Sequence, residues 1–200
     1  YRVQRTPDSD DALHVFMEQL GRELPQPDHL EIDPPTGHPG AEEGRLWGEA
    51  DARQSIRYLR AQAGTMGIDP GRIGIMGFSA GGGIAINAAL EFDAMSRPDF
   101  VGGIYAGYRL GPEVPPDAPP LFLAIADDDA PVAPISSARL YEAWHKARRP
   151  VELHIFGSGG HGFGFNRLDL LSDSWTDLVR KWLAAGGWLS TSMEKDNAKT

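Results

Sequence analysis

A serine between two glycines is the first candidate for chemistry in this sequence. Residues 77–81 read G-F-S-A-G and match the pattern G-x-S-x-G around Ser79. A short apolar stretch at 72–76 precedes the motif and a run of small residues over 80–90 follows it, which predicts a strand, a sharp turn and a helix. Such a turn exposes the serine Oγ above the sheet, at the positive end of the helix. We expect glycines at both ends because a strained turn leaves no room for side chains there.

The motif alone is moderately specific. Because 24 of the 200 residues are glycine, a glycine-rich turn before an ordinary helix could match it by chance. The order of strand, turn and helix is what the motif requires, and it favours Ser79 as a nucleophile.

His161 and an acidic run supply the partners that a nucleophilic serine needs. A serine hydroxyl is a weak nucleophile without a base. His161 lies in a glycine-rich loop, and three aspartates occupy 127–129, each after a predicted strand. The imidazole would accept the serine proton, an aspartate would fix its tautomer, and the backbone N–H of Ala80 would stabilise the oxyanion. The order Ser–Asp–His fits this chemistry, but the residues leave open which aspartate acts.

Other patterns in the chain have simpler explanations. His154 lies within a predicted strand and is interpreted as an ordinary surface or core residue. Residues 157–162 match G-x-G-x-x-G, but only the final helix follows them, so they do not open the βαβ unit that binds a dinucleotide. A group of loop residues lacks the spacing of a metal site and is interpreted as solvated. These residues are His29, Glu31, His38 and Glu42.

Predicted strands and helices alternate along most of the chain. The strands are expected at 1–3, 72–76, 100–108, 121–126 and 151–156. The helices are expected at 12–20, 46–66, 80–90, 136–149 and 173–185, with a proline-rich surface loop at 25–44. This alternation predicts a mostly parallel sheet with helices on both faces. Ligands bind such a sheet at the carboxyl ends of its strands, where Ser79, the aspartates and His161 are expected.

Composition excludes several classes of function. A net charge of −9, spread along the chain, argues against a nucleic-acid surface or an anionic membrane as partner. No apolar run is long enough to cross a bilayer, and no secretory signal opens the sequence. The absence of cysteine excludes disulfides and thiolate chemistry. We therefore expect a soluble protein, while its compartment, cytoplasmic or secreted, stays open.

Four segments resemble α/β-hydrolase serine esterases of the acetyl-xylan-esterase and BD-FAE (bifunctional deacetylase/feruloyl esterase) type. They are ADARQSIRYLRAQAGTMGIDPGRIGIMGFSAGGGIA, PLFLAIADDDAPVAP, PVELHIFGSGGHGFGF and SWTDLVRKWLAAGGWL. The resemblance implies an α/β-hydrolase domain over 1–189, followed by a polar tail at 190–200. It also implies hydrolysis of carboxylic esters, typically acetyl groups on carbohydrate, with no metal or organic cofactor.

The resemblance also assigns individual residues. It places the acid of the triad at Asp129, with Asp128 as the runner-up, beside Ser79 and His161. The aromatic side chains of Phe78 and Phe163 are candidates for an acyl pocket, with plain core packing as the alternative.

The chain departs from this family at its start. Residues 1–3 resemble a strand that, in the family, follows a PGGGY- or HGGG-like loop supplying the second oxyanion N–H. An irregular helix-plus-loop insertion at 6–45 is longer than the usual link, and the whole resembles an N-terminally truncated hydrolase with about five strands. We therefore expect weakened hydrolysis, and an open edge on the strand before Ser79 that invites pairing with a second copy. The rival expectation is a non-catalytic hydrolase-fold fragment that acts as a binding or structural module.

Overall fold

The structure is a computed structural model that describes residues 41–108 and 113–189. The described residues belong to one unit of the chain, which spans 39–200. The strand expected at 1–3, the helix expected at 12–20, nearly all of the proline-rich loop and the tail at 190–200 lie outside the described residues. The prediction of one domain over 1–189 therefore stays a prediction.

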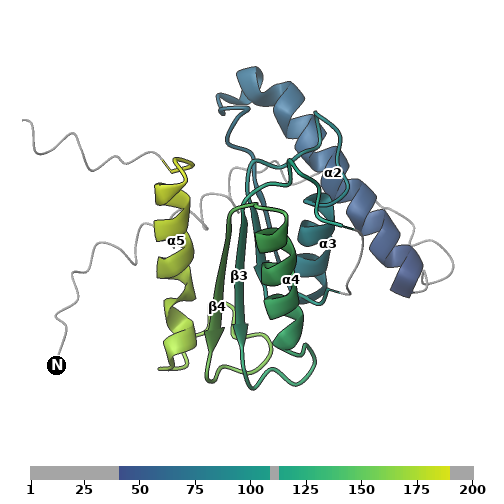
Figure 1. Cartoon of the computed structure of the whole chain (residues 1–200). Coiled ribbons are helices and arrows are strands. Elements are labelled where there is room, and N and C mark those ends of the chain that lie inside the picture. The colour runs from purple at the N-terminus through teal and green to yellow at the C-terminus, as the bar shows by residue number, and fades with distance from the viewer. Residues whose placement is uncertain (1–40, 109–112, 190–200) are drawn as a thin grey trace, which may run out of the picture. The chain divides into compact units, whose positions relative to one another are not determined.

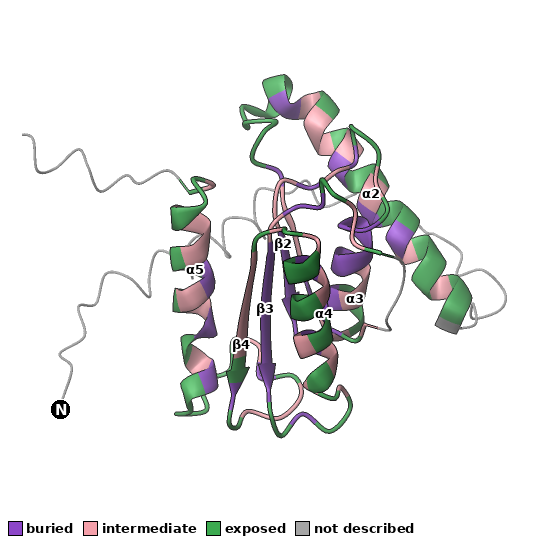
Figure 2. Cartoon of the chain, in the orientation of Figure 1, coloured by how far each residue is buried: buried purple, intermediate pink, exposed green. Residues whose placement is uncertain are grey.

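A four-stranded parallel sheet forms the centre of the described unit (Figure 1). Its strands lie side by side in chain order: β1 (Ile75–Phe78), β2 (Val101–Ile104), β3 (Leu121–Ala126) and β4 (Val151–Phe156). The predicted bounds of β3 and β4 are confirmed, and β3 is buried along its whole length (Figure 2). The predicted parallel arrangement is likewise confirmed, and it puts the carboxyl ends of all four strands at one edge.

The other two strands differ from their predicted bounds. β1 begins at Ile75, three residues later than expected, and β2 covers only four of the nine predicted positions. β2 ends at Ile104 because Tyr105 adopts a left-handed φ of 37°, which breaks the extended conformation. The glycines of β2 permit a close approach, since a Cβ on Gly102 would lie 2.6 Å from the Met76 side chain.

Helices precede, separate and follow the strands, except that β3 follows β2 with no helix between them. The helices are α2 (Ala41–Met66), α3 (Ser79–Ala88), α4 (Ile135–Lys146) and α5 (Trp175–Ala185), the last preceded by a 3₁₀ turn at Leu171–Ser174. Within 41–108 and 113–189, no helix combines the length and the apolar character that crossing a bilayer requires.

The start of α2 corrects two predictions. The surface loop predicted at 25–44 is wrong for residues 41–44, which are helical, and the helix predicted from residue 46 begins at Ala41. Glu42 and Glu43 lie in the first helical turn, where acidic side chains favour the helix N-terminus. Arg45 adds ion pairs to Glu42 and to Glu49, at the i,i+3 and i,i+4 spacings that stabilise a helix.

Helices cover both faces of the sheet, and each face has its own buried cluster. On one face, α3 and α4 contribute Ile86 and Trp144, which pack with Leu121 and Leu123 of β3. On the other face, α5 contributes Trp175 and Val179, which pack with Phe122 and Ala124 of the same strand. The alternation of β3 side chains between the two clusters confirms a sheet buried on both sides.

α2 packs on α3 through a third cluster. Ala52 and Ile56 of α2 meet Ala88 of α3 and Ile73, which precedes β1. The apolar side of α2 therefore faces α3 and the start of β1. This contact secures the segment that leads into Ser79.

Candidate active site

Ser79 lies at the junction between β1 and α3. Phe78 is still extended, with φ of −118° and ψ of 139°, and Ser79, the first helical residue, has a φ of 52°. A positive φ is uncommon outside glycine and is maintained only where the surrounding structure enforces it. The structure therefore contains the sharp strand-to-helix turn that the motif predicted.

The two glycines of the motif have different surroundings. A Cβ on Gly77 would lie 2.1 Å from the carbonyl oxygen of Gly81, so no side chain fits there. A Cβ on Gly81 would meet no heavy atom within 4 Å, and its φ is not left-handed. The expectation that both ends of the turn are crowded is thus wrong for Gly81, because α3 turns its backbone, and not its side-chain position, toward β1.

The next two glycines bring α3 close to the residues after β2. A Cβ on Gly82 would lie 2.8 Å from the Ala106 Cβ, and one on Gly83 would lie 2.3 Å from the Gly107 carbonyl oxygen. The N–H of Gly107 donates to the carbonyl oxygen of Ser79 at 3.0 Å. The small-residue start of the helix therefore lets the Ser79 turn bind directly to the carboxyl end of β2.

Three predicted side chains meet at the carboxyl edge of the sheet. The Ser79 Oγ lies 2.9 Å from Nε2 of His161. On the other side of the ring, Nδ1 lies 2.9 Å from Oδ2 and 3.1 Å from Oδ1 of Asp129. A neutral imidazole that donates from Nδ1 to the carboxylate is free to accept the serine proton at Nε2. We call Ser79, His161 and Asp129 the triad.

Asp129 is well placed to hold an ionised carboxylate. Its side chain has no exposed surface, and the Val132 N–H donates to Oδ1 at 2.9 Å. Two donors, this amide and the imidazole N–H, thus compensate the burial of the charge. Of the three aspartates, Asp129 is the one whose side chain contacts His161.

Asp128, the runner-up for the acid, has a different contact. Its Oδ1 accepts a hydrogen bond from the Gly160 N–H at 2.7 Å. Its side chain is exposed, whereas that of Asp129 is buried. The structure therefore brings Asp128 to the loop that carries His161, and not to the imidazole.

Tyr105 is a residue that sequence reasoning missed. It follows β2 directly, is 6% exposed, and its ring centroid lies 5.0 Å from that of His161 in an edge-on arrangement. Burial raises the pKa of the Tyr105 hydroxyl, so the phenol is neutral at physiological pH. Its position at the carboxyl end of a strand was an available signal, which the overlong strand prediction at 100–108 concealed.

The two phenylalanines named for an acyl pocket belong to the cluster under α5. Phe163 is 2% exposed and packs edge-on against Tyr105, with centroids 4.8 Å apart. Phe78 is partly buried and packs edge-on against Trp175 at 5.7 Å. Both contacts are those of ordinary core packing, and the acyl-pocket role stays a prediction.

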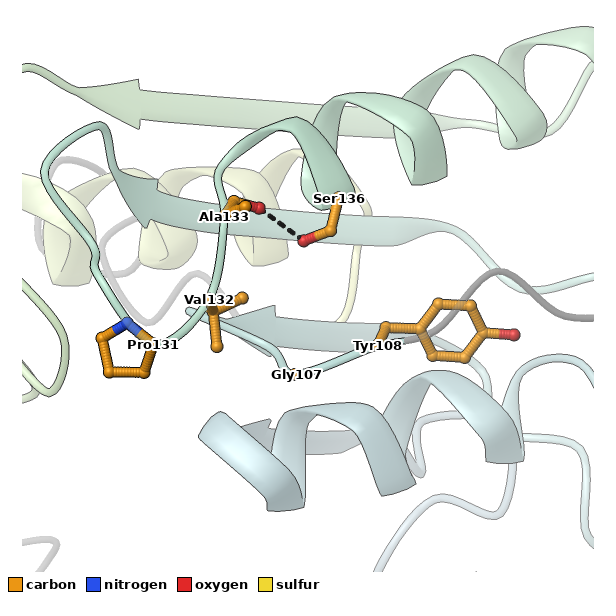
Figure 3. A pocket seen from close by; sticks show the side chains of 6 residues that line it. All are labelled: Gly107, Tyr108, Pro131, Val132, Ala133 and Ser136. Atoms are coloured by element: carbon orange, nitrogen blue, oxygen red, sulfur yellow. Dashed lines mark hydrogen bonds between the residues drawn. The ribbon is translucent and has the colours of Figure 1, made fainter.

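A shallow hollow of about 300 Å³ lies beside the residues that hold the triad (Figure 3). Its lining comes from the segment after β2 and from the segment that leads into α4. The lining residues are Gly107, Tyr108, Pro131, Val132, Ala133 and Ser136. Two of them also contact triad residues, since Gly107 binds the Ser79 backbone and Val132 binds Asp129. Burial raises the pKa of Tyr108 to about 12, so its hydroxyl is neutral at physiological pH.

The backbone N–H of Ala80 is the predicted oxyanion donor. Ala80 is the second residue of α3 and is exposed, and amides in the first turn of a helix lack intrahelical acceptors. Its N–H is therefore available to a ligand, while the oxyanion role itself stays a prediction.

Residues 157–162 form a loop, and the next helical turn begins only at Leu171, so the segment lacks the helix that a dinucleotide site needs.

Comparison with known proteins shows that the chain is similar to ester hydrolases. The BD-FAE family model matches residues 48–99, which contain the Ser79 turn. An acetylxylan esterase of Xylanibacter ruminicola is 27% identical over 165 residues, which cover 66% of this chain and 34% of that protein. A solved acetyl ester-xyloside bifunctional hydrolase from Caldicellulosiruptor lactoaceticus superimposes with a TM-score of 0.66 at 30% identity, covering 71% of this chain and 66% of that one.

A second solved structure gives the same result for the fold. MGS-M1, an α/β-hydrolase enzyme from a Medee basin deep-sea metagenome library, superimposes with a TM-score of 0.63 at 30% identity, covering 70% of this chain and 65% of that one. The parallel sheet and these neighbours show that the chain has the α/β-hydrolase fold. The chain spans about a third of the curated relative's length and about two thirds of the solved structures.

Proposed function

We propose that this chain is a serine carboxylesterase that acts through an acyl-enzyme on Ser79. The observation that carries the proposal is the continuous hydrogen-bonded triad, with 2.9 Å from Ser79 to His161 and 2.9 Å from His161 to Asp129. Both distances are within the range of hydrogen bonds between a nucleophile, its base and the group that orients the base. The esterases among the similar proteins support the same reaction class.

In the first half-reaction, the Ser79 Oγ attacks the ester carbonyl while His161 Nε2 accepts the hydroxyl proton. The buried Asp129 carboxylate stabilises the imidazolium that forms. The Ala80 N–H, at the positive end of α3, donates to the developing oxyanion. His161 then protonates the leaving alcohol. In the second half-reaction, a water molecule takes the place of the alcohol and releases the acid from Ser79.

We propose short-chain esters of acetyl type, on carbohydrate alcohols, as the substrate class. The support is the similarity to two proteins, one an acetylxylan esterase and one an acetyl ester-xyloside bifunctional hydrolase. The alternative of a non-catalytic binding or structural module is not favoured, because neither role requires a serine, a histidine and a buried carboxylate in hydrogen-bonded order.

We also propose that the open edge of β1 pairs with a second copy of the chain. Within the described residues, β1 pairs with β2 alone, so one side of its backbone has no strand beside it. An unpaired strand edge presents N–H and C=O groups that can bind another strand.

Active-site labelling tests the catalytic proposal directly. A fluorophosphonate probe should attach covalently to Ser79, and the purified chain should hydrolyse p-nitrophenyl acetate. S79A should lose both properties, whereas S55A, which removes an exposed hydroxyl on α2, should keep both. Absence of the adduct from the folded wild-type chain would reject the proposal. Acetylated xylo-oligosaccharides compared with their butyrylated forms would then test the substrate class.

A further inference from the structure

A second carboxylate beside the triad is not explained by the reaction chemistry. Asp128 does not contact His161, yet its Oδ1 lies 2.7 Å from the Gly160 nitrogen. Gly160 immediately precedes His161, and Asp129 immediately follows Asp128. Consecutive carboxylates therefore bind consecutive residues of the loop, Asp128 to Gly160 and Asp129 to His161. A hydrogen bond to an ionised acceptor is stronger than one between neutral groups.

The loop that carries His161 has little means of holding its own shape. Four of its glycines have positive φ values, which are 152° at Gly159, 63° at Gly160, 84° at Gly162 and 45° at Gly164. Glycine loses more conformational freedom on folding than any other residue, so a loop of this composition needs contacts from outside. Gly160 and Gly162 have no heavy atom within 4 Å of the Cβ position, so packing at that position does not restrain the residues that flank His161.

The backbone on both sides of Asp128 is, by contrast, hydrogen-bonded to the sheet. The N–H of Asp127 donates to the Phe156 carbonyl oxygen at 2.7 Å, which continues the pairing of β3 with β4 beyond Ala126. The Asp129 N–H returns to the Ala126 carbonyl oxygen in a turn. Asp128 is therefore held between two residues whose backbones are anchored to strand β3 and its partner.

We propose that Asp128 is a positioning residue of this site, whose carboxylate fixes the backbone of Gly160 and thereby the His161 imidazole between Ser79 and Asp129. The proposal rests on the proposed esterase function. It reassigns Asp128 from runner-up acid to a separate role, acting through the backbone on the general base.

Kinetics of three variants test this role. D128A removes the acceptor and should lower kcat for p-nitrophenyl acetate by about 10- to 100-fold, because a displacement of about 1 Å in a catalytic group costs that much. KM should change less than about twofold, since Asp128 does not contact the substrate in this proposal. D128N keeps an acceptor oxygen and should recover most of the lost rate. D127A removes the same charge from the exposed neighbouring side chain and should match the wild type.

A measurement that needs no activity separates this inference from the proposed function. Amide hydrogen exchange at Gly160, followed by NMR on the full chain, should be faster in D128A than in the wild type and unchanged in D127A. If the wild type hydrolyses no ester, the proposed function fails, while the exchange rates still test the hydrogen bond to Gly160. Equal exchange at Gly160 in D128A and D127A would overturn the inference. A rise in KM at constant kcat in D128A, or an equal loss of kcat in D128N and D128A, would also overturn it.

Discussion

The Ser79 Oγ and the His161 Nε2 lie 2.9 Å apart, although 82 positions separate the two residues in the sequence. Ser79 follows β1 and His161 follows β4, which are the two outer strands of the described sheet. The loop after β4 therefore reaches back past the carboxyl ends of β3 and β2. Asp129 follows β3 and Tyr105 follows β2, and both side chains contact the His161 imidazole. Each of the other three strands is thus followed by a residue that contacts His161.

Replacing the buried Asp129 carboxylate by an amide should test its role in orienting His161. In D129N the side chain keeps its shape, but its NH₂ group opposes the Nδ1–H that the triad requires. We expect kcat to fall by about 10⁴-fold, because the imidazole is driven into the wrong tautomer. Hydrolysis of p-nitrophenyl acetate measures the loss.

The matched comparison for D129N is D128N, which changes the adjacent carboxylate in the same way. It should keep most of the wild-type kcat, because its remaining oxygen still accepts from Gly160. Comparable losses in the two variants would contradict the assignment of the acid to Asp129.

The two glycines of the motif should respond differently to alanine. In G77A the new Cβ would lie 2.1 Å from the Gly81 carbonyl oxygen, so the turn must shift. Forced overpacking of this kind typically costs about 1–3 kcal/mol, and the displaced Ser79 should also lose activity. Urea unfolding and fluorophosphonate labelling measure the two effects.

G81A provides the control at the other end of the motif. Its Cβ meets no heavy atom within 4 Å, and alanine is favoured over glycine inside a helix by about 0.5–1 kcal/mol. We therefore expect G81A to keep or raise the free energy of unfolding. A loss of stability as large as that of G77A would show that both ends of the turn are crowded.

Asp93, an exposed aspartate that follows α3, should titrate at a lower pH than an ordinary aspartate. Hydrogen bonds from Arg57, foremost, and from the Ser96 backbone N–H lower the pKa of Asp93 well below its ordinary value of 3.8. Because the pKa of Asp93 is lower in the folded chain than in the unfolded chain, its ionised carboxylate stabilises the fold at any pH above the unfolded-state pKa. This stabilisation is lost as the pH falls from the unfolded-state pKa through the folded-state pKa. NMR titration of the Asp93 carboxyl should give this low midpoint, and R57Q should raise it.

R72Q serves as the control for this titration. It removes the arginine of another exposed pair, Arg72 with Asp69, and should leave the Asp93 midpoint unchanged.

The difference in melting temperature between wild type and R57Q should narrow as the pH falls below about 4, where Asp93 in the unfolded chain becomes protonated. An Asp93 midpoint that is the same in R57Q and wild type would contradict the assigned cause.

The open edge of β1 should make the mass in solution depend on concentration. Light scattering should give a weight above 21.7 kDa that rises toward a dimer as the chain is concentrated. A mass of 21.7 kDa at every concentration would count against pairing through this edge.

Much of the fold was predictable because its signals are local. The apolar runs that became β3 and β4 are bounded by turn residues, so their limits needed no knowledge of their neighbours. β2 was harder, since its apolar character continues past Ile104 while the left-handed Tyr105 ends the strand. The start of α2 was missed because glycines and prolines before it resemble a loop, whereas ion pairs around Arg45 favour a helix.

Sequence patterns were enough to predict the order of strands and helices, the parallel sheet, and a serine, aspartates and a histidine after three of its strands. These follow from periodicity and from motif spacing, which act over a few residues. The folded structure adds that Asp129, the aspartate that the family resemblance named, contacts His161, that the Tyr105 ring lies against the imidazole, and that Gly77 is crowded while Gly81 is not. Those contacts join residues far apart in the chain, and they depend on strand register and loop backbone angles that no local pattern encodes.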